Sequence, residues 1–322
     1  MPLKTSQYIW HEGKLVPWAE ATVHVLTHAL HYGSSVFEGV RVYQTPSGPM
    51  GFRLTDHIRR MLHSAKVYRL KIPYSQEVLV EACKEVIRAN SLTNGAYIRP
   101  IAFRGYGEMG VAGNPEQPAS CSIAAWEWGS YLGEGGLEKG VDVCVSSWQR
   151  VAPNTIPAMA KAAGNYLSSI LVTLEARRLG FAEGLALNSS GFVSEGAGEN
   201  LFLVQQGVLY TPPVAASILA GLTRDTVMKL AESLGVKVVE QNIPREWLYI
   251  ADEVFLTGSA AEITPVRSID RITIGEGRRG PLTERLQKQF FGLFDGSTAD
   301  RWGWLEPILP GGKAHVERTF AV

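Results

Sequence analysis

A lysine without charged neighbours and an acid among very small residues constrain this chain more than any other feature of its sequence. Lys161 is the only charged residue between Val151 and Leu174. Glu195 lies in the segment Ser194-Glu195-Gly196-Ala197-Gly198, just before an apolar run that is typical of a strand. We expect one helix and one hairpin between the two residues, which is enough chain to bring both to the same edge of a sheet.

These two residues match the chemical needs of a pyridoxal phosphate enzyme. Apolar neighbours favour the neutral form of a lysine amine, which can then form a Schiff base and move a proton. A carboxylate next to the pyridine nitrogen of the cofactor keeps that nitrogen protonated, so that the ring can accept electrons from a substrate carbanion. The sequence therefore predicts Lys161 as nucleophile and proton carrier, and Glu195 as the partner of the ring nitrogen.

Simpler interpretations of both residues stay open at this point. Lys161 could be a surface lysine at the start of a helix, and Glu195 could be a turn carboxylate that caps the backbone of a Gly-rich loop. Gly196-Ala197-Gly198 also resembles part of a dinucleotide-binding loop, which makes a non-catalytic nucleotide-binding module the alternative from another functional class. That motif is incomplete, because Leu201 occupies the position of its last glycine and a strand follows where a helix is required.

Length and composition indicate a soluble protein of ordinary make-up. The chain has 322 residues, of which 31 are basic and 31 acidic, and it is long enough for two domains or one large one. Balanced charge gives no reason to expect nucleic acid or a membrane surface as partner, and no apolar run reaches the ~20 residues that cross a bilayer. The N-terminus lacks a signal-peptide pattern, and Cys83, Cys121 and Cys144 form no close pair, so we expect a cytoplasmic protein with structural thiols.

Strands and helices are mixed without a regular βαβ order, which predicts an α+β fold. In the first part of the chain we expect a hairpin over residues 8–16, helices at Asp56–Leu70 and Gln76–Ala89, and strands at Val40–Tyr43, Ala96–Phe103, Ser120–Trp128 and Val141–Ser147. The Gly-rich residues 131–136 are predicted to connect a small domain, residues 1–130, to a larger domain, residues 137–322.

In the larger domain, beyond the strand at Val141–Ser147, a helix is expected at Ala162–Gly180. Four strands are then predicted to form a meander, at Gly184–Asn188, Phe192–Ser194, Asn200–Val204 and Val208–Thr211. A further helix is predicted to begin at Gly221-Leu222-Thr223 and to end at Gly235.

Two places in the sequence could supply hydrogen-bond donors to a phosphate group. Gly221-Leu222-Thr223 offers the N–H groups of a helix start together with a hydroxyl, although Thr223 could equally be a plain helix N-cap. Arg59 and Arg60 are neighbours on a predicted helix, so that one can reach an anion while the other stays solvated.

A strand and a group of histidines complete the candidate residues. Tyr97 and Arg99 alternate along one strand, so both face the same side, which is either a plain solvent face or a site that binds a carboxylate. His24, His28 and His31 have the spacing of metal ligands on a continuous helix. We predict no metal site there, because residues 23–26 look extended and no acid or cysteine completes the set; packing or hydrogen-bonding roles near the active site are expected instead.

Several longer motifs make the chain resemble a bacterial branched-chain amino acid aminotransferase, in the fold-type IV class of pyridoxal phosphate enzymes. The likeness runs from about Tyr8 to Trp304. The motifs that carry it are His28–Gly33, Ser35–Gly39, Tyr97–Pro100, Ala152–Pro157, Lys161, Gly164–Ser169, Ser194–Phe202 and Ala260–Val266.

The resemblance implies a two-domain, D-amino acid aminotransferase-like fold with pyridoxal 5′-phosphate between the domains. It also implies a homo-oligomer, at least a dimer and often a hexamer, with the site at the subunit interface. For the cofactor it implies Lys161 as the covalent attachment, Glu195 at the ring nitrogen, Tyr166 beside the phenolic oxygen, and Arg60, Leu222, Thr223 and Ser259 at the phosphate. For the substrate it implies Tyr97, Ser259 and Ala260 at the α-carboxylate, Phe37, Trp128 and Tyr131 around the side chain, and Arg99 with Tyr32 and Val111 of the partner subunit at the distal carboxylate of glutamate.

The activity implied is branched-chain-amino-acid transamination, the exchange of an amino group between L-leucine, L-isoleucine or L-valine and 2-oxoglutarate, in amino-acid biosynthesis. The nearest alternatives have the same fold: a D-amino acid or (R)-amine transaminase, or a lyase. Tyr97 and Arg99 on one strand favour the first interpretation. The loop Gly105–Gly110, which places Glu108 near a pocket mouth, and the C-terminal tail depart from the family pattern and bear on acceptor preference and assembly.

Overall fold

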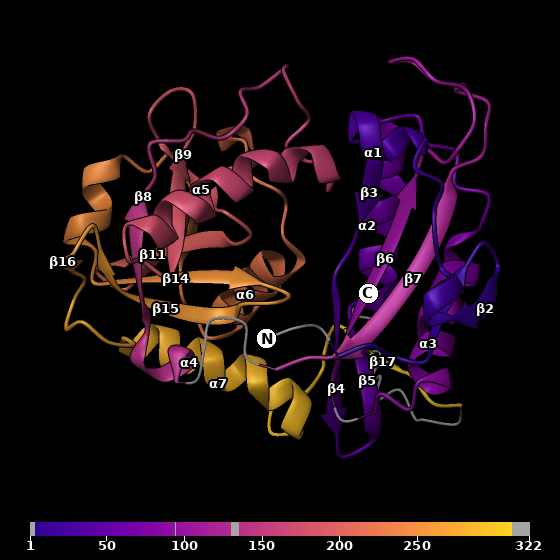
Figure 1. The fold of residues 1–322 in the computed structure, drawn as a ribbon. Coiled ribbons are helices and arrows are strands. Elements are labelled where there is room, and N and C mark those ends of the chain that lie inside the picture. The colour runs from indigo at the N-terminus through magenta and orange to yellow at the C-terminus, as the bar shows by residue number, and fades with distance from the viewer. Residues whose placement is uncertain (1–3, 94, 130–134, 311–322) are drawn as a thin grey trace, which may run out of the picture. The chain divides into compact units, whose positions relative to one another are not determined.

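The structure, a computed structural model, describes residues 4–93, 95–129 and 135–310. The chain divides into two compact units. Unit 1 consists of the described residues of Met1–Gly129, Ala160–Gly164 and Gly292–Val322, and unit 2 of those of Ser130–Met159 and Asn165–Phe291. Within the described residues each unit contains one large sheet with helices beside it (Figure 1), so the predicted α+β class is confirmed.

The sheet of unit 1 is antiparallel in its pairings, and its strands follow the order β17-β5-β4-β6-β7-β1-β2, with β3 paired to β6. Its strands are β1 (Tyr8–His11), β2 (Lys14–Pro17), β3 (Ser35–Phe37), β4 (Val40–Thr45), β5 (Gly48–Phe52), β6 (Ala96–Phe103), β7 (Ser120–Glu127) and β17 (Leu305–Pro307). Its helices are η1 (Trp18–Glu20), α1 (His28–Tyr32), α2 (Leu54–Val67) and α3 (Gln76–Ala89). The bounds predicted for β6 and α3 are confirmed.

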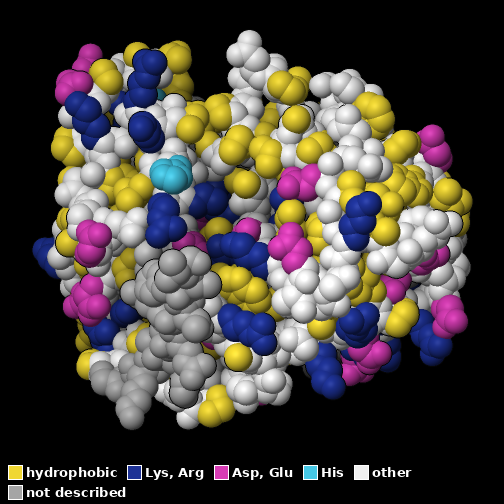
Figure 2. All heavy atoms as spheres, turned by 180° about the vertical axis from the view of Figure 1, so that it is seen from behind, with side chains coloured by type: hydrophobic (Ala, Val, Ile, Leu, Met, Phe, Trp, Pro, Cys, Tyr) yellow, Lys and Arg dark blue, Asp and Glu magenta, His cyan; other side chains and the backbone are white. Residues whose placement is uncertain are grey.

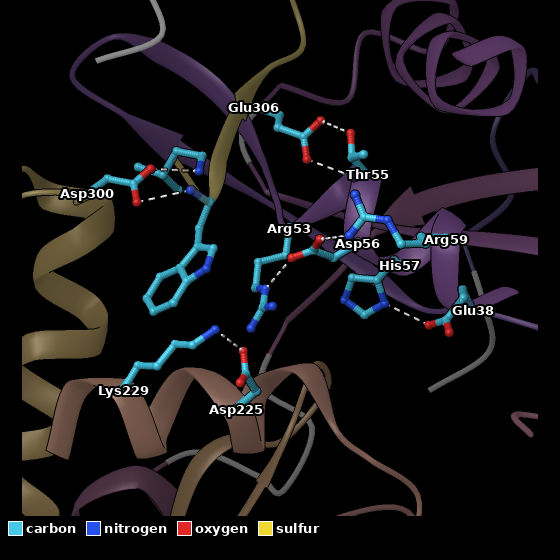
Figure 3. Close-up of polar contacts among 12 residues, drawn as sticks. Glu38, Arg53, Thr55, Asp56, His57, Arg59, Asp225, Lys229, Asp300 and Glu306 are labelled. Atoms are coloured by element: carbon cyan, nitrogen blue, oxygen red, sulfur yellow. Dashed lines mark hydrogen bonds and ion pairs between the residues drawn. The ribbon is translucent and has the colours of Figure 1, made fainter. Parts of the chain in front are cut away.

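Helices α2 and α3 pack their apolar faces into the core of unit 1. The buried residues of α3 recur at helical spacing, and Ser75 caps its first turn by accepting a hydrogen bond from the Val78 N–H at 3.4 Å. Helix α2 begins at Leu54, two residues before the predicted start. The reason is a distant cap: the Glu306 carboxylate accepts from the Thr55 N–H at 2.7 Å and from its hydroxyl at 2.6 Å (Figure 3).

The sheet of unit 2 is mixed, in the order β10-β9-β8-β15-β14-β11-β12-β13, with β16 paired to β15. Its strands are β8 (Val141–Val145), β9 (Glu183–Leu187), β10 (Val193–Gly196), β11 (Asn200–Gln205), β12 (Val208–Thr211), β13 (Val238–Glu240), β14 (Glu253–Gly258), β15 (Glu262–Ile269) and β16 (Ile272–Thr273). The remaining helices are α4 (Gly136–Lys139), η2 (Ala163–Asn165), α5 (Tyr166–Arg178), η3 (Val214–Ala216), α6 (Leu222–Ser233), η4 (Arg245–Ile250) and α7 (Pro281–Asp295).

The predicted meander is wrong, because β10 and β11 are not sheet neighbours. Strand β9 pairs with β10 on one side and runs parallel to β8 on the other, as expected when the intervening α5 makes a crossover. Strand β11 pairs instead with β12 and β14. Nearly every residue of β11 is buried, which is typical of a central strand, and β14 supplies its second neighbour from later in the chain.

The division into units also differs from the predicted domain bounds at two places. Residues Ala160–Gly164 belong to unit 1, where Ala162 forms a β-bridge to Val36. The chain from Gly292 onward also belongs to unit 1, because β17 pairs with β5. Most of the predicted connection, residues 131–136, lies outside the described residues, as does the tail beyond residue 310.

Basic and acidic side chains are interspersed on the face drawn in Figure 2. Across the part of the chain that the structure describes, no helix combines the length and the apolar character needed to cross a membrane.

Candidate active site

Lys161 is fixed through its backbone in unit 1. Its N–H donates to the Ser64 hydroxyl of α2 at 3.0 Å, and its carbonyl accepts from the Phe37 N–H at the end of β3, also at 3.0 Å. Its Nζ lies 5.0 Å from the centre of the Phe37 ring. At this distance the amine lies over the face of the ring, so Phe37 helps to orient the Lys161 side chain.

A buried polar cluster lies beside this lysine, and of its members only Arg60 was singled out from the sequence. Glu38, between β3 and β4, accepts from Arg60 at 2.6 and 2.8 Å. Its Oε2 lies 2.6 Å from His57 Nδ1 (Figure 3). Burial alone would raise the pKa of Glu38, but the charges and hydrogen bonds of Arg60 and His57 hold it well below its ordinary value. His57, Arg60 and Ser64 recur at helical spacing along α2, which is the signal that could have revealed the cluster.

The two neighbouring arginines of α2 have different surroundings, as expected. The Arg60 side chain is 14% exposed and pairs with Glu38, whereas that of Arg59 is 50% exposed and pairs with Asp56 at 2.6 Å. Arg60 is therefore the arginine that belongs to the interior of unit 1.

Aromatic rings surround Arg99 on β6. Its guanidinium carbon lies 4.8 Å from the ring centre of Phe37, 5.4 Å from Tyr97 and 5.8 Å from Trp126, and its Nε is buried without a hydrogen-bond partner among the described residues. Trp128 stacks on Tyr97 with ring centres 4.6 Å apart. Trp126 was missed from the sequence, although it alternates with Trp128 and pairs in register with Tyr97. A guanidinium held among rings in this way is suited to a carboxylate ligand.

The Tyr97 hydroxyl lies directly over Gly39. A Cβ atom at Gly39 would stand 1.8 Å from this oxygen, so only glycine fits beneath it. The expectation that Tyr97 and Arg99 share one face is confirmed, because both contact Trp126.

Residues around α1 contribute exposed apolar surface and histidine hydrogen bonds. Tyr32 and Val111 are exposed, at 44% and 86%. His28 lies 2.7 Å from the Ser34 hydroxyl and 2.8 Å from the Gly110 carbonyl, and His31 lies 3.0 Å from the Val25 carbonyl. These are the packing and hydrogen-bonding contacts expected of the histidines. Tyr131 lies outside the described residues.

Glu195 is buried in unit 2 and held on both of its oxygens. Its Oε1 is 2.7 Å from Arg150 Nη2, and its Oε2 accepts from Asn200 Nδ2 and from the Leu219 N–H, each at 3.0 Å. The Glu199 carboxylate contacts the Gly-rich segment, where its Oε2 accepts from the Gly198 N–H at 3.1 Å. Glu195 is thus an oriented, charge-paired acid.

The N-terminus of α6 has the geometry of an anion site. Helix α6 begins at Leu222 and its N-cap is Gly221, which forms no side-chain cap bond, so the alternative with Thr223 as N-cap is wrong. Thr223 lies inside the first turn and is buried. A helix start attracts anions through its dipole and its N–H groups.

The other candidates of unit 2 lie at element ends. Tyr166 opens α5, and Ser259 and Ala260 follow β14. Thr257 of β14 faces Asn200 in register, and its buried hydroxyl has no hydrogen-bond partner within the described part of the chain. A buried unpaired hydroxyl, an oriented acid and an anion-attracting helix start together fit a phosphate-bearing heterocycle.

Comparison with known proteins gives one consistent result. The family model described as class IV amino-transferase matches residues 35–269. The branched-chain-amino-acid aminotransferase of Escherichia coli (strain K12) is 56% identical over 312 residues, covering 96% of this chain and 99% of the relative. The enzyme of the same name from Pseudomonas aeruginosa is 47% identical over 296 residues, covering 92% and 95%.

Solved structures agree with these relatives. The crystal structure of the Escherichia coli branched-chain amino acid aminotransferase superimposes with a TM-score of 0.94 at 56% identity, covering 95% of this chain and 100% of that chain. The branched-chain amino acid aminotransferase from Thermobaculum terrenum, in its PLP-form, gives a TM-score of 0.88 at 34% identity, covering 95% and 99%.

Proposed function

Because this chain belongs to the class IV aminotransferase family, we propose that it exchanges the amino group between L-leucine, L-isoleucine or L-valine and 2-oxoglutarate. The products are the branched-chain 2-oxo acids and L-glutamate. The observation that carries the substrate assignment is Arg99, whose guanidinium lies among aromatic rings with its Nε unpaired within the described residues. Such a site accepts an aliphatic side chain against the rings and a second carboxylate against the guanidinium.

The cofactor of the proposed reaction is pyridoxal 5′-phosphate, which when bound supplies an electron-accepting ring. Lys161 would hold it covalently, and Glu195 would bind its ring nitrogen. Tyr166 would contact the phenolic oxygen. The residues proposed to bind its phosphate are Arg60, Leu222, Thr223 and Ser259.

Within this reaction the residues have separate tasks. Lys161 Nζ moves the proton at the substrate Cα. The two backbone hydrogen bonds of Lys161, with Ser64 and Phe37, fix the point from which its side chain extends. Glu195 offers an ionised oxygen in a fixed direction, because a cation and two N–H donors hold it.

Substrate binding follows from the aromatic cluster of unit 1. Tyr97, with the backbone of Ser259 and Ala260, would bind the α-carboxylate. The side-chain pocket would be lined by Phe37, Trp128 and Tyr131. Arg99 would bind the distal carboxylate of glutamate together with Tyr32 and Val111 of the partner subunit.

Exposed apolar side chains support the proposal of a homo-oligomer, from a dimer to a hexamer. The proposed location of the protein is the cytoplasm. Val111 on unit 1 and Leu167, Ile170 and Leu174 along one face of α5 are each more than half exposed. A helix face of this kind is typical of an interface between subunits.

A panel of three amine donors with 2-oxoglutarate tests the proposal. L-leucine is expected to react, and D-alanine and (R)-1-phenylethylamine to react far more slowly. Activity on the last two alone would reject the assignment in favour of a D-amino acid or (R)-amine transaminase. The purified protein is expected to absorb in the visible range and, after borohydride, to carry the cofactor on the peptide that contains Lys161. A colourless protein that binds nucleotide would support the non-catalytic alternative.

A further inference from the structure

Arg150, which the sequence did not single out, is a buried partner of Glu195. It lies on the loop after β8, and its N–H donates to the Leu187 carbonyl of β9 at 2.9 Å. Its Nη2 is 2.7 Å from Glu195 Oε1, and its Nη1 is 3.4 Å from the Ser169 hydroxyl of α5. Its buried Nε has no hydrogen-bond partner among the described residues. The guanidinium is therefore directed chiefly at Glu195.

The other oxygen of Glu195 is fixed by a network that reaches the start of α6. Asn200 Nδ2 donates to Glu195 Oε2 at 3.0 Å and to the Leu219 carbonyl at 2.9 Å. A Cβ atom at Gly221 would stand 1.9 Å from Asn200 Oδ1, so the N-cap of α6 closes directly over this amide. Arg150 and Asn200 thus hold the carboxylate from two sides, and Asn200 connects it to the proposed phosphate site.

Besides orienting Glu195, Arg150 affects its ionisation through its positive charge. A carboxylate buried without a cation tends to take up a proton, because the low-dielectric interior penalises its charged form. A guanidinium that is hydrogen-bonded to the carboxylate stabilises its negative charge. A protonated base on the other side of the carboxylate lies farther from the guanidinium, so the repulsion between these two positive charges is weaker than that stabilisation. A proton shared between this carboxylate and a bound base is therefore driven to the base.

We propose that Arg150 is a positioning residue that keeps Glu195 ionised and oriented, so that the proton shared with the cofactor rests on the ring nitrogen. This inference depends on the proposed function, since it requires that Glu195 bind that nitrogen. Arg150 acts only through Glu195 and does not itself touch the substrate.

The test compares two variants. R150Q keeps a hydrogen-bond donor but loses the positive charge, and R150K keeps the positive charge but loses the planar guanidinium with its several N–H donors. Each variant is loaded with cofactor labelled with ¹⁵N in the ring, and the nitrogen signal is followed against pH. In the wild type and in R150K the nitrogen is expected to stay protonated near neutral pH. In R150Q it is expected to lose its proton about one to two pH units lower than in the wild type, with kcat for L-leucine reduced about 10- to 100-fold.

Arg178→Gln, at an exposed arginine of α5, is the control and should change neither measurement. An R150Q holoprotein with the wild-type nitrogen signal at every pH would overturn the inference while leaving the transaminase intact. A wild-type protein that binds no cofactor would overturn the proposed function and this inference together. Should R150Q fail to fold, R150M takes its place as the neutral variant. If the nitrogen signal then had the same pH dependence in R150M as in R150K, the role of charge would again be refuted.

Discussion

The Arg60 guanidinium donates hydrogen bonds to both carboxylate oxygens of Glu38, with Nε 2.6 Å from Oε1 and Nη2 2.8 Å from Oε2. His57 lies 2.6 Å from the same Oε2 (Figure 3). The Glu38 side chain is fully buried. Glu38 follows β3, while Arg60 and His57 belong to α2, the helix whose Ser64 also binds the Lys161 backbone. The ion pair therefore connects the strand and the helix between which Lys161 is held.

Glu38→Gln is expected to destabilise the protein by about 3–5 kcal/mol, because it leaves the Arg60 charge buried without its counterion. Urea unfolding gives the free-energy difference directly. Glu276→Gln is the matched control, since Glu276 and Arg278 form an exposed pair, at 77% and 72%, and should change stability by less than about 0.5 kcal/mol. Equal effects of the two variants would show that the buried pair does not hold the helix to the strand.

His57 makes the stability of the protein depend on pH. Burial lowers its pKa; Glu38 opposes that shift, and the charges of Arg60 and Lys161 add to it. Because the unfolded chain then binds the proton more readily, the stability from His57 is complete above the unfolded pKa of about 6.5 and is lost as the pH falls toward the lower folded value.

His57→Gln should therefore flatten the decline in stability between about pH 7 and pH 5, by up to about 1.4 kcal/mol per pH unit. Urea unfolding of both proteins across that range measures the two slopes. His63→Gln, at an exposed position of the same helix, serves as the control and is expected to keep the wild-type slope. A slope in H57Q as steep as in the wild type would contradict the account.

Arg99→Met is expected to separate the two half-reactions of the proposed enzyme. Loss of the guanidinium removes the partner of the distal carboxylate, so kcat/KM for 2-oxoglutarate should fall about 100-fold. The value for L-leucine should change by only a few fold, because the aromatic rings remain. Single-turnover kinetics with each substrate measures both. An equal loss for the two substrates would argue that Arg99 supports the fold of the site instead of selecting the acceptor.

Local sequence patterns were sufficient for elements whose stability is local. The bounds of α3 could be predicted because an apolar stripe runs along it and Ser75, directly before it, caps its first turn. Those of β6 could be predicted because alternation runs along a single strand. Lys161 and Glu195 could be singled out because their immediate neighbours are unusual. The part that each plays toward a cofactor is still a prediction.

What the sequence could not show depends on partners far along the chain. The start of α2 is set by Glu306, which is 251 residues from Thr55. Arg150 looks like any loop arginine until β8, β9 and α5 enclose it beside Glu195. The pairing of β11 with β14 likewise depends on a strand that comes much later in the chain. The meander prediction instead paired β11 with β10, the strand just before it in the sequence.

A carboxylate distant in sequence also caps α7, and this arrangement gives a prediction for unit 2. Glu253 of β14 accepts from the Leu282 N–H at 2.9 Å, from the Thr283 N–H at 2.8 Å and from the Thr283 hydroxyl at 2.6 Å. A Cβ atom at Gly280 would stand 2.1 Å from the Glu253 carboxyl carbon. The acid and the glycine therefore fit each other, and the cap requires both.

Glu253→Ala should lower the free energy of unfolding by about 2–4 kcal/mol through the lost cap, and Gly280→Ala by about 1–3 kcal/mol through overcrowding. The double variant should lose less free energy of unfolding than the two single variants lose together, because removing the Glu253 carboxylate also removes its clash with a Cβ at residue 280. Urea unfolding of all four proteins completes the cycle. Gly129→Ala, where an added Cβ meets nothing within 4 Å, is the control for added volume. Strict additivity would mean that Gly280 and Glu253 act independently, because a shared clash must appear as a coupling between the two positions.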